Sequence, residues 1–392
     1  MKLSNRIATI NGAAGDADGW RILYLARDAA ERGEDITMLC IGDHDTPTPE
    51  PILTATKQAL DSGNTRYAAV DGTIPLRQAI AKRTTERTGI PTSPDDVFVT
   101  GGGQGALFAA MMGAIDPGDA AVIIDPYYTT YPPTVRAASG ELRIVKANPE
   151  TGFQIDRDTL LKATEGAKAL LINTPNNPTG AVYTDDTLAH IREACLTHDL
   201  WCLSDEVYDT QTHGRPHISP RQLPDMADRT LVIGSLSKSH IMTGFRLGWL
   251  IGPQSFIDPV IHLTNATTYG TPGFIQDAAV TALNDCSTEE AETAALYTRR
   301  RNLALEALKG SNALRVSPPD GAMYVMLDIR QTGLSGDAFA ERLLTEKHIA
   351  TMPGESFGEA ASGHIRVALT QPDEILAPAL KTIAQFAQEI AS

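Results

Sequence analysis

Cysteine is scarce in this sequence. The 392 residues include four cysteines, Cys40, Cys195, Cys202 and Cys286, which lie far apart and without CxxC spacing. Zinc sites and disulfide-stabilised domains need cysteines that are clustered or regularly spaced. The sequence therefore predicts no metal site and no disulfide framework, and it predicts that the four thiols are reduced and buried.

Long apolar runs are also missing. No run reaches the roughly 18–20 residues that a membrane-spanning helix needs, and the N-terminus, MKLSNRIATI, lacks the apolar core of a signal peptide. We therefore expect a globular cytoplasmic protein without a membrane partner. The 42% of hydrophobic residues and the length of 392 residues are enough for a core and for two domains of ordinary size.

Positive charge is in deficit. Lysine and arginine together number 33 against 48 acidic residues, which leaves a formal net charge of −15. Nucleic acids and anionic membranes are bound by basic surfaces, so this balance argues against either as the main partner. If the ligand is an anion, a few individually placed cations must hold it.

Short β-rich runs alternate with amphipathic helical stretches from about residue 96. The runs are VFVT, AVIID, LRIVK, ALLIN, WCLSD, TLVIGS and LGWLIG, and helical stretches include 103–114, 156–165 and 185–198. Alternation of this kind predicts an α/β fold whose mostly parallel sheet is buried on both faces. Ligands of such sheets bind beyond the carboxyl ends of the strands. The polar residues that end five of the runs should therefore gather at one place: Thr100, Asp125, Asn173, Asp205 and Ser235.

The flanking segments predict a second, smaller α+β domain. Residues 20–33 form a helical pattern, a long helix begins at about residue 288, and MYVMLDI and HIRVAL predict strands of a smaller sheet. We predict a large domain over residues 46–288 and a small domain built from residues 1–45 together with 289–392.

The stretch VFVTGGGQGALFAA reads as a strand, a glycine run and a helix. Glycines let the backbone approach a phosphate closely, and the helix start offers free N–H groups. Gly101, Gly103 and Ala106 also satisfy the G-x-G-x-x-A dinucleotide pattern, with Asp125 at the end of the next strand. Phosphate binding, dinucleotide binding and a structural turn all remain open on this motif alone.

Two further strand ends carry polar residues suited to a cofactor. In LLINTPNNPTG, Asn177 is held extended before Pro178 and could donate to a ring oxygen or a carboxylate, although asparagine is also a common turn residue. In WCLSDEVYD, Asp205 ends a buried strand and needs a cation or donor, and Tyr208 follows three residues later. Glu206 points to the other side of the chain and is left out of the site, because it could as easily belong to a structural ion pair.

The stretch SLSKSHIMTGFRLGW follows a buried strand. Lys238 is a candidate nucleophile of the Schiff-base kind, if its pKa is lowered. Arg246, Ser235 and Ser237 suit a phosphate dianion, through charge and hydroxyl hydrogen bonds. A loop with a solvated lysine is the alternative, and the strand before the stretch and the Gly244-Phe245-Arg246 turn argue against it.

Arg366 lies in the alternating strand pattern SGHIRVAL. A partly buried arginine suggests a bidentate partner, for which a ligand carboxylate is a common choice. A structural salt bridge is the competing interpretation.

Taken together and in this order, TGGGQGAL, DPYY, NTPNNPTG, SDEVY, SLSK with a following Gly-x-Arg, and HIRVAL resemble the class I/II aminotransferases, the fold-type I pyridoxal-phosphate enzymes. The resemblance runs from about residue 20 to the C-terminus. It implies a seven-stranded type of large-domain sheet, a smaller α+β domain, and pyridoxal 5'-phosphate as cofactor.

The resemblance also implies catalytic roles. Lys238 would form the internal aldimine with the cofactor and then move the proton between the substrate Cα and the cofactor. Asp205 would bind the pyridine nitrogen and keep it protonated. Tyr208 and Asn177 would hydrogen-bond the ring oxygen, and Tyr128, in DPYYTTY, would stack on the ring.

Binding roles follow in the same way. The resemblance implies a phosphate site made of Gly103, Gln104, Ser235, Ser237 and Arg246. Arg366 would clamp the substrate α-carboxylate, with Gly42 and Asn177 contacting the substrate. Family members are usually homodimers, and Tyr67 resembles the tyrosine that reaches the phosphate of the neighbouring subunit.

Three residues depart from the usual family pattern. His44, in GDHDTPTP, stands where proline is common, Met112 is apolar where some acid-specific members carry a polar or basic residue, and Ile241 is bulky three residues after the lysine. The departures at His44 and Met112 argue mildly against a strict aspartate enzyme, and Ile241 has no assigned role. Trp20 and Trp249 add apolar surface, and Trp249 is expected in the core.

The leading function is therefore an aminotransferase that moves an amino group from an L-α-amino acid to a 2-oxo acid by a ping-pong mechanism. The alternatives are a pyridoxal-phosphate-dependent carbon–sulfur β-lyase and, from another class, an NAD-dependent dehydrogenase built on the glycine run and Asp125. A regulator fused to a DNA-binding module is not expected, because the enzyme-like segment begins near residue 20 and the chain is acidic.

Overall fold

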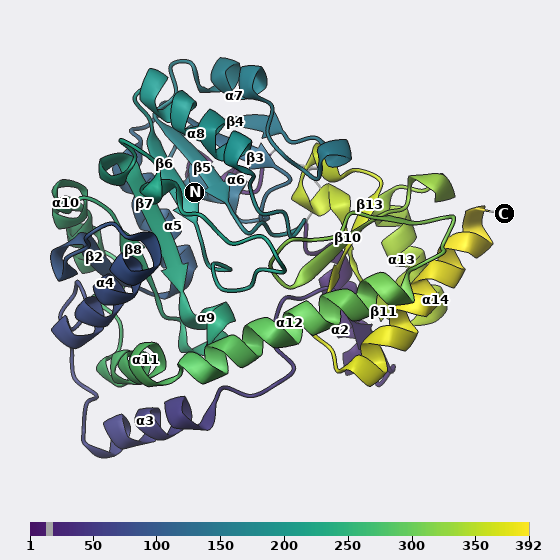
Figure 1. The fold of residues 1–392 in the computed structure, drawn as a ribbon, viewed down its shortest axis with the longest axis horizontal. Helices are drawn as coiled ribbons and strands as arrows, with labels where there is room; N and C mark the ends of the chain where they lie inside the picture. The colour runs from purple at the N-terminus through teal and green to yellow at the C-terminus, as the bar shows by residue number, and fades with distance from the viewer. Residues whose placement is uncertain (13–18, 392) are drawn as a thin grey trace.

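The computed structural model describes residues 1–12 and 19–391. The described residues form three sheets: a larger one surrounded by helices, a smaller one near the C-terminus, and a two-stranded one (Figure 1). The described part of the chain holds no helix that is both long and apolar enough to cross a membrane.

The larger sheet has seven strands in the order β2-β8-β7-β6-β5-β3-β4. They are β2 (Val97–Thr100), β3 (Ala120–Asp125), β4 (Glu141–Lys146), β5 (Ala169–Asn173), β6 (Trp201–Asp205), β7 (Thr230–Ser235) and β8 (Gly248–Ile251). All neighbouring pairs from β4 to β7 are parallel, and β8 is antiparallel to both β7 and β2. The predicted α/β fold with a mostly parallel seven-stranded sheet is confirmed.

Alternating side chains of this sheet enter different cores. Ile123 and Leu171 pack in one apolar cluster, whereas Val122 and Leu170 pack in another. Because successive side chains of a strand point to opposite faces, the near-continuous apolar runs show that both faces are covered. The covering helices are α4 (Ile74–Thr88), α5 (Gly102–Ala114), α6 (Tyr131–Ala137), α7 (Arg157–Thr164), α8 (Asp185–Thr197), α10 (Gln254–Asn265) and α11 (Gly273–Asp285).

The smaller sheet has four antiparallel strands in the order β12-β13-β10-β9. They are β9 (Arg315–Val316), β10 (Tyr324–Asp328), β12 (Met352–Pro353) and β13 (His364–Ala368). Helices α2 (Arg21–Glu31), α13 (Gly336–Lys347) and α14 (Asp373–Ala391) pack around it. The predicted strands MYVMLDI and HIRVAL are β10 and β13.

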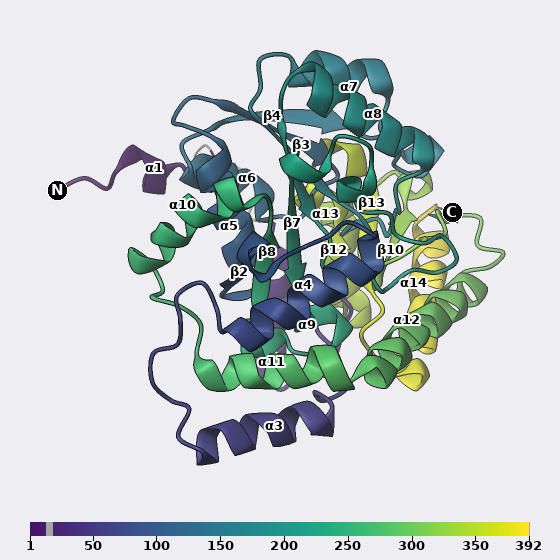
Figure 2. The same cartoon turned by 60° about the vertical axis from the view of Figure 1, so that its left-hand side comes forward.

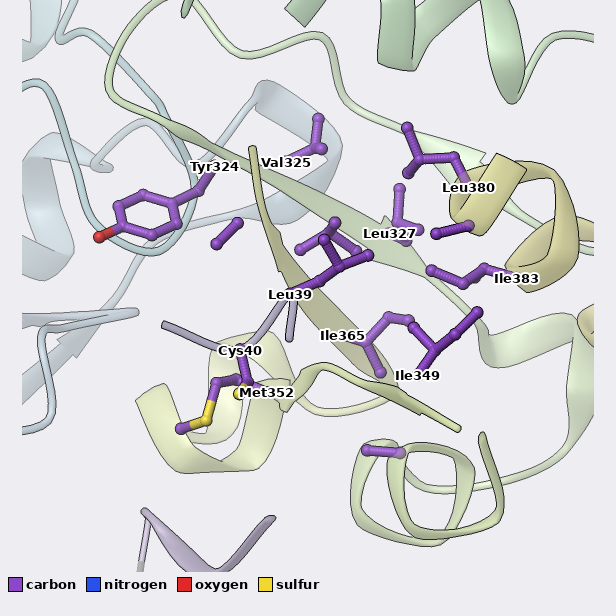
Figure 3. Close-up of a cluster of buried hydrophobic side chains, with 14 of the residues drawn as sticks. Leu39, Cys40, Tyr324, Val325, Leu327, Ile349, Met352, Ile365, Leu380 and Ile383 are labelled. Atoms are coloured by element: carbon purple, nitrogen blue, oxygen red, sulfur yellow. The ribbon is translucent and has the colours of Figure 1, made fainter. Parts of the chain in front are cut away.

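The N-terminal segment packs on this C-terminal part of the chain. Strand β1 (Thr37–Met38) pairs in parallel with β11 (Ile349–Ala350). Leu39 and Cys40 lie in the same apolar cluster as Ile365, Leu380 and Ile383 (Figure 3).

One long helix connects the two parts. Helix α12 (Ser287–Ala307) contacts α9 (Leu236–Ser239) and α11 on the larger-sheet side and α14 and β10 on the smaller-sheet side (Figure 1). Helix α3 (Glu50–Asp61) lies against α11, and α1 (Asn5–Ala8) projects from the body with the N-terminus (Figure 2). The domain limits, 46–288 and 1–45 with 289–392, stay a prediction.

Candidate active site

A cavity of about 320 Å³ opens between the carboxyl ends of the larger-sheet strands and the smaller sheet. Strand ends, the start of α5, helix α9, the N-terminal segment and strands β10 and β13 all contribute to its wall. The lining residues are Trp20, Ile41, Gly42, Asp43, Gly103, Gln104, Leu107, Tyr128, Tyr131, Asn173, Asn177, Asp205, Val207, Tyr208, Ser235, Ser237, Lys238, Thr243, Arg246, Tyr324 and Arg366.

Three of the five predicted strand-end residues line this cavity, namely Asn173, Asp205 and Ser235. Thr100 does not, and its hydroxyl donates to the carbonyl oxygen of Gly102 at 3.0 Å. Asp125 also lies elsewhere, where its carboxylate accepts from the backbone N–H of Ala360 at 3.0 Å. The expectation that all five gather at one place is therefore wrong for Thr100 and Asp125. The Asp125 carboxylate thus binds the protein backbone outside the cavity. It is not placed to bind a ribose there, so the dinucleotide interpretation lacks the acidic residue that it requires.

Asp205 is a buried carboxylate at the floor of the cavity. Its Oδ2 accepts from the hydroxyl of Tyr131 at 2.7 Å, and its Oδ1 accepts from the N–H of Val207 at 3.3 Å. Burial disfavours the charged form and raises the pKa of Asp205 to about 6, against the lowering effect of these two donors. No cation within ion-pair distance is found for Asp205 among the described residues, so a cationic group of a ligand would be stabilised here.

Lys238 reaches into the cavity from the short helix α9, directly after β7. Ser235 caps this helix by accepting from the N–H of Ser237 at 3.1 Å. The Ser235 hydroxyl also donates to the carbonyl oxygen of Leu247 at 3.0 Å, which ties the start of α9 to the segment before β8. The ammonium of Lys238 donates to the carbonyl oxygen of Gly42, across the cavity in the N-terminal segment.

Arg246 lies against the glycine run at the start of α5. A Cβ built on Gly102 would come within 2.5 Å of Arg246 Nη2, and Gly102 has a φ of +78°. Arg246 itself adopts a left-handed φ of 52° and donates from Nη1 to the carbonyl oxygen of Thr243 at 2.8 Å. A guanidinium beside free helix N–H groups forms an anion site. The Gln104 side chain, by contrast, is bonded to Thr130 and Thr134.

Arg366 is almost fully buried, with 2% of its surface exposed. It donates from Nη1 to Asn177 Oδ1 at 2.9 Å and from Nη2 to the carbonyl oxygen of Cys40 at 2.6 Å. Its guanidinium lies 4.4 Å from the ring centre of Tyr324 and 4.7 Å from that of Phe357. Its Nε has no hydrogen-bond partner in the described chain, and no carboxylate there pairs with it. The structural salt bridge considered from the sequence is thus not formed, and the buried charge is left for an anionic ligand.

Two tyrosines in the cavity wall were not identified from the sequence. Tyr131 binds Asp205, and the Tyr324 hydroxyl lies 3.0 Å from that of Tyr208. A Cβ on Gly42 would lie 1.8 Å from the Tyr324 hydroxyl oxygen, so the close approach requires glycine there. Tyr131 is the third tyrosine of DPYYTTY, and the only sequence signal for it was this local enrichment in tyrosine.

Tyr67 does not line the cavity. Its side chain is 86% exposed, and its ring packs edge-on against Tyr269 with 5.1 Å between ring centres. Glu206 also lies outside the cavity, where it pairs with His217 at 3.0 Å, in line with the structural alternative.

The residues that depart from the family pattern, and Trp249, lie in environments that differ from one another. His44 Nδ1 lies 2.9 Å from the hydroxyl of Tyr297, and burial, with Lys238 nearby, lowers the pKa of His44 to about 4. Ile241 has a left-handed φ of 55°, and its carbonyl oxygen accepts from Thr48. Met112 is exposed, and Trp249 is buried in the core as expected.

Comparisons with known proteins agree with the geometry. A sequence model of the family Aminotransferase class I and II matches residues 34–383. The chain is 42% identical to an arginine–pyruvate transaminase of Pseudomonas aeruginosa, over 96% of each chain. It is 34% identical to an aspartate/prephenate aminotransferase of Thermus thermophilus, over 98% of each chain.

Solved structures show the same fold. A double mutant of the Thermus thermophilus aspartate aminotransferase superposes with a TM-score of 0.92 at 33% identity, covering 98% of this chain and 100% of that one. An aspartate aminotransferase of Thermotoga maritima superposes with a TM-score of 0.91 at 32% identity, covering 98% of this chain and 100% of that one.

Proposed function

We propose an active site for this chain, which belongs to the class I and II aminotransferase family. The chain is an aminotransferase, an enzyme that moves an amino group from an amino acid to a 2-oxo acid. Its named relatives above are transaminases, so the carbon–sulfur lyase alternative has no support from them. One observation carries the proposal: the Lys238 ammonium lies in one cavity with Asp205, Arg246 and Arg366.

The residues of the cavity fit pyridoxal phosphate, the cofactor of this family. Arg246 beside the space left by Gly102 suits a phosphate dianion, and the buried carboxylate of Asp205 suits a protonated pyridine nitrogen. The Tyr128 ring in the cavity wall suits stacking on the pyridine ring. When bound, the cofactor supplies an electron sink for the charge left on the substrate Cα after its proton is removed.

The cofactor would be held at both of its ends. We assign its phosphate to the backbone of Gly103 and Gln104, to Ser235, Ser237 and Arg246, and to Tyr67 of the partner subunit. Asp205 would hold the opposite, pyridine end, and its own orientation is set by Tyr131. Tyr208 and Asn177 would donate to the ring oxygen, with Tyr324 orienting the Tyr208 hydroxyl.

The substrate would be oriented by its α-carboxylate. Arg366 is held in place by Cys40, Asn177 and two aromatic rings, so its guanidinium loses little conformational entropy on binding. Gly42 and Asn177 line the same cavity as Arg366. With the α-carboxylate held at Arg366, the Lys238 amine would be placed to take the proton from the substrate Cα and to hold it for the later transfer step. The two half-reactions follow each other in a ping-pong order.

We infer that arginine is an amino donor and pyruvate an acceptor. The support is the relative named arginine–pyruvate transaminase, which is 42% identical over 96% of both chains. Formation of alanine from pyruvate with arginine as donor, followed by chromatography, tests this inference directly.

We infer that the protein is a cytoplasmic homodimer whose sites are completed across the interface. The exposed rings of Tyr67 and Tyr269 support the interface, and the four free, buried cysteines support a reducing compartment. Sedimentation equilibrium of the purified protein tests the dimer, and a monomer at micromolar concentration contradicts it.

Replacing Lys238 tests the central assignment. Lys238→Ala should lower turnover at least about 10³-fold, because the general base and the covalent attachment point are both removed. Reduction with borohydride should fix the cofactor covalently to the wild-type protein, and peptide mapping should place it on Lys238.

The matched control is Lys57→Ala, which removes an exposed lysine of α3 whose side chain is 68% exposed. It should turn over and be labelled like the wild type. Full activity of Lys238→Ala, or labelling of another lysine, would overturn the assignment.

A further inference from the structure

Of the charged side chains that line the cavity, the proposed function assigns a role to every cation but leaves one anion without a role. Each of the cavity's three cations has a place in the proposed function: Lys238 at the reacting carbon, Arg246 at the phosphate and Arg366 at the α-carboxylate. Among the described residues that line the cavity, no fourth cation is left for the side chain of a substrate. One anion, Asp43, has no place in that scheme.

Asp43 lies close to the reacting centre. It follows Gly42, whose carbonyl oxygen accepts from the Lys238 ammonium. Arg366 binds the carbonyl oxygen of Cys40, three residues earlier. Since consecutive Cα atoms are 3.8 Å apart, the Cα atoms of residues 40 and 43 are separated by at most about 11 Å. A substrate held by its carboxylate at Arg366 thus has Asp43 within reach of a long side chain.

One oxygen of the Asp43 carboxylate is hydrogen-bonded, and the other has no hydrogen-bond partner among the described residues. Its Oδ1 accepts from the N–H of His44 at 3.0 Å and from the hydroxyl of Thr243 at 2.9 Å. No hydrogen bond to Oδ2, and no ion pair of this carboxylate, is found among the described residues. Asp43 is exposed and lines the cavity, so the open oxygen lies at its mouth.

An aromatic ring belongs to the same cavity wall. Trp20 is half-buried and packs edge-on against Tyr128, with 6.4 Å between ring centres. A planar guanidinium can stack on an indole face and donate at its edge to a carboxylate, whereas a neutral group of the same shape gains much less from either contact.

We propose that Asp43, assisted by the Trp20 ring, selects amino donors whose side chain ends in a guanidinium. This inference rests on the proposed function and adds the residues that determine its specificity. A donor with a distal carboxylate meets a like charge at Asp43 and, among the described lining residues of this chain, no cation without an assigned role, so Asp43 disfavours acidic donors.

The test compares arginine with citrulline in the cofactor-loaded enzyme, with pyruvate as acceptor. The two donors have nearly the same shape, but the ureido group of citrulline is neutral. The wild-type kcat/KM should favour arginine at least about tenfold. Asp43→Asn keeps an oxygen acceptor for His44 and Thr243 while removing the charge, and it should bring the arginine-to-citrulline ratio close to one. Asp43→Glu should restore a preference for arginine.

The ratio serves as its own control, because general damage to the site lowers both rates. Asp61→Asn removes an acidic charge from the end of α3, outside the cavity, and should keep the wild-type ratio. An unchanged ratio in Asp43→Asn, or wild-type turnover of both donors without a preference, overturns this inference alone. Absence of transamination with every donor, including alanine, overturns the proposed function itself.

Discussion

Asp205 is the residue for which burial and function conflict most clearly. In the protein without cofactor its carboxyl group has a raised pKa of about 6, against an ordinary value of 3.8, because it is buried. The folded state therefore binds more protons than the unfolded state between these two pH values. It follows that the stability associated with the neutral carboxyl is fully present below pH 4 and is lost as the pH rises through 6.

Asp205→Asn should therefore stabilise the cofactor-free protein at alkaline pH while it removes activity. A shift of about two pKa units corresponds to about 3 kcal/mol, and we expect a gain of up to that size in the unfolding free energy at pH 8. At pH 4 the gain should vanish. Denaturant unfolding of the two cofactor-free proteins at both pH values measures it, and an equal difference at pH 4 and pH 8 would contradict the explanation.

His44 has the opposite pH dependence. Its pKa is lowered to about 4 by burial and by the nearby Lys238, so the folded state binds fewer protons than the unfolded state between about pH 4 and 6.5. Stability is therefore present above pH 6.5 and is lost as the pH falls toward 4. His44→Asn keeps an acceptor for the Tyr297 hydroxyl and cannot titrate.

The variant should thus lose about 2 kcal/mol less stability than the wild type between pH 7.5 and pH 4.5, measured by urea unfolding. The pKa of His240 is lowered in the same way, but this residue is present in both proteins and does not affect the difference. Parallel pH profiles of the two proteins would show that His44 does not carry the effect.

At the scale of single residues, the candidate cofactor- and substrate-binding residues were easier to identify from the sequence than the residues that hold them in position. Lys238, Asp205, Asn177, Arg246 and Arg366 could be identified because each follows or lies in a recognisable strand, and all five line one cavity. Their roles stay predictions. The contacts made by Tyr131 and Tyr324 could not be predicted, because the first joins α6 to the end of β6 and the second joins the segment after β6 to β10, and no local pattern specifies either approach.

At the scale of an element, the glycine run at the start of α5 allows a prediction about cofactor affinity. Gly102→Ala would force a Cβ to within 2.5 Å of Arg246 Nη2 at a left-handed φ of +78°. We expect the affinity for pyridoxal phosphate to fall about 10- to 100-fold, as displacement of one charged contact would cause. Gly101→Ala is the matched control, since a Cβ there meets nothing within 4 Å.

Titration of the cofactor-free variants with pyridoxal phosphate, followed by absorbance, gives both affinities. If both variants bind like the wild type, the guanidinium and this turn do not form the phosphate site.

The elements themselves were largely predictable. All seven β-rich runs form strands of the larger sheet, and the helical stretches at 103–114, 156–165 and 185–198 correspond to α5, α7 and α8. Apolar runs separated by helical periodicity are strong local signals. The reversed direction of β8 was not predicted, because direction depends on the short connection between β7 and β8, which contains Lys238 and Arg246.

At the scale of the molecule, one ion pair joins the N-terminal segment to α12. Asp45 and Arg300 are bonded through both carboxylate oxygens at 2.8 and 2.6 Å, with side chains only 12% and 4% exposed. Asp45→Ala leaves a buried guanidinium with fewer partners and should lower the unfolding free energy by about 3 kcal/mol.

The exposed pair Arg342–Glu346 of α13 is the comparison, with side chains 46% and 45% exposed. Glu346→Ala should cost much less stability than Asp45→Ala, because an exposed ion pair is solvated and screened. Chemical denaturation of both variants measures the costs, and equal losses would contradict the importance assigned to the buried pair.

Contacts between segments far apart in the sequence were the hardest feature to predict. The parallel pairing of β1 with β11 joins residues 37–38 to 349–350, and no local pattern in either segment specifies this partner. A cavity built from such distant segments is therefore visible in the sequence only as separate motifs.

The late position of β13 has a consequence for synthesis of the protein on the ribosome. The seven strands of the larger sheet are all present once residue 251 has been made, whereas Arg366, the residue proposed to bind the substrate carboxylate, lies in β13, near the C-terminus. Since domains fold as units from the N-terminus during synthesis, the strand ends and the Lys238 helix can form while the chain is still attached. The nascent chain would thus complete the proposed cofactor-binding residues before Arg366 is made, so we expect catalysis only after nearly the whole chain has emerged.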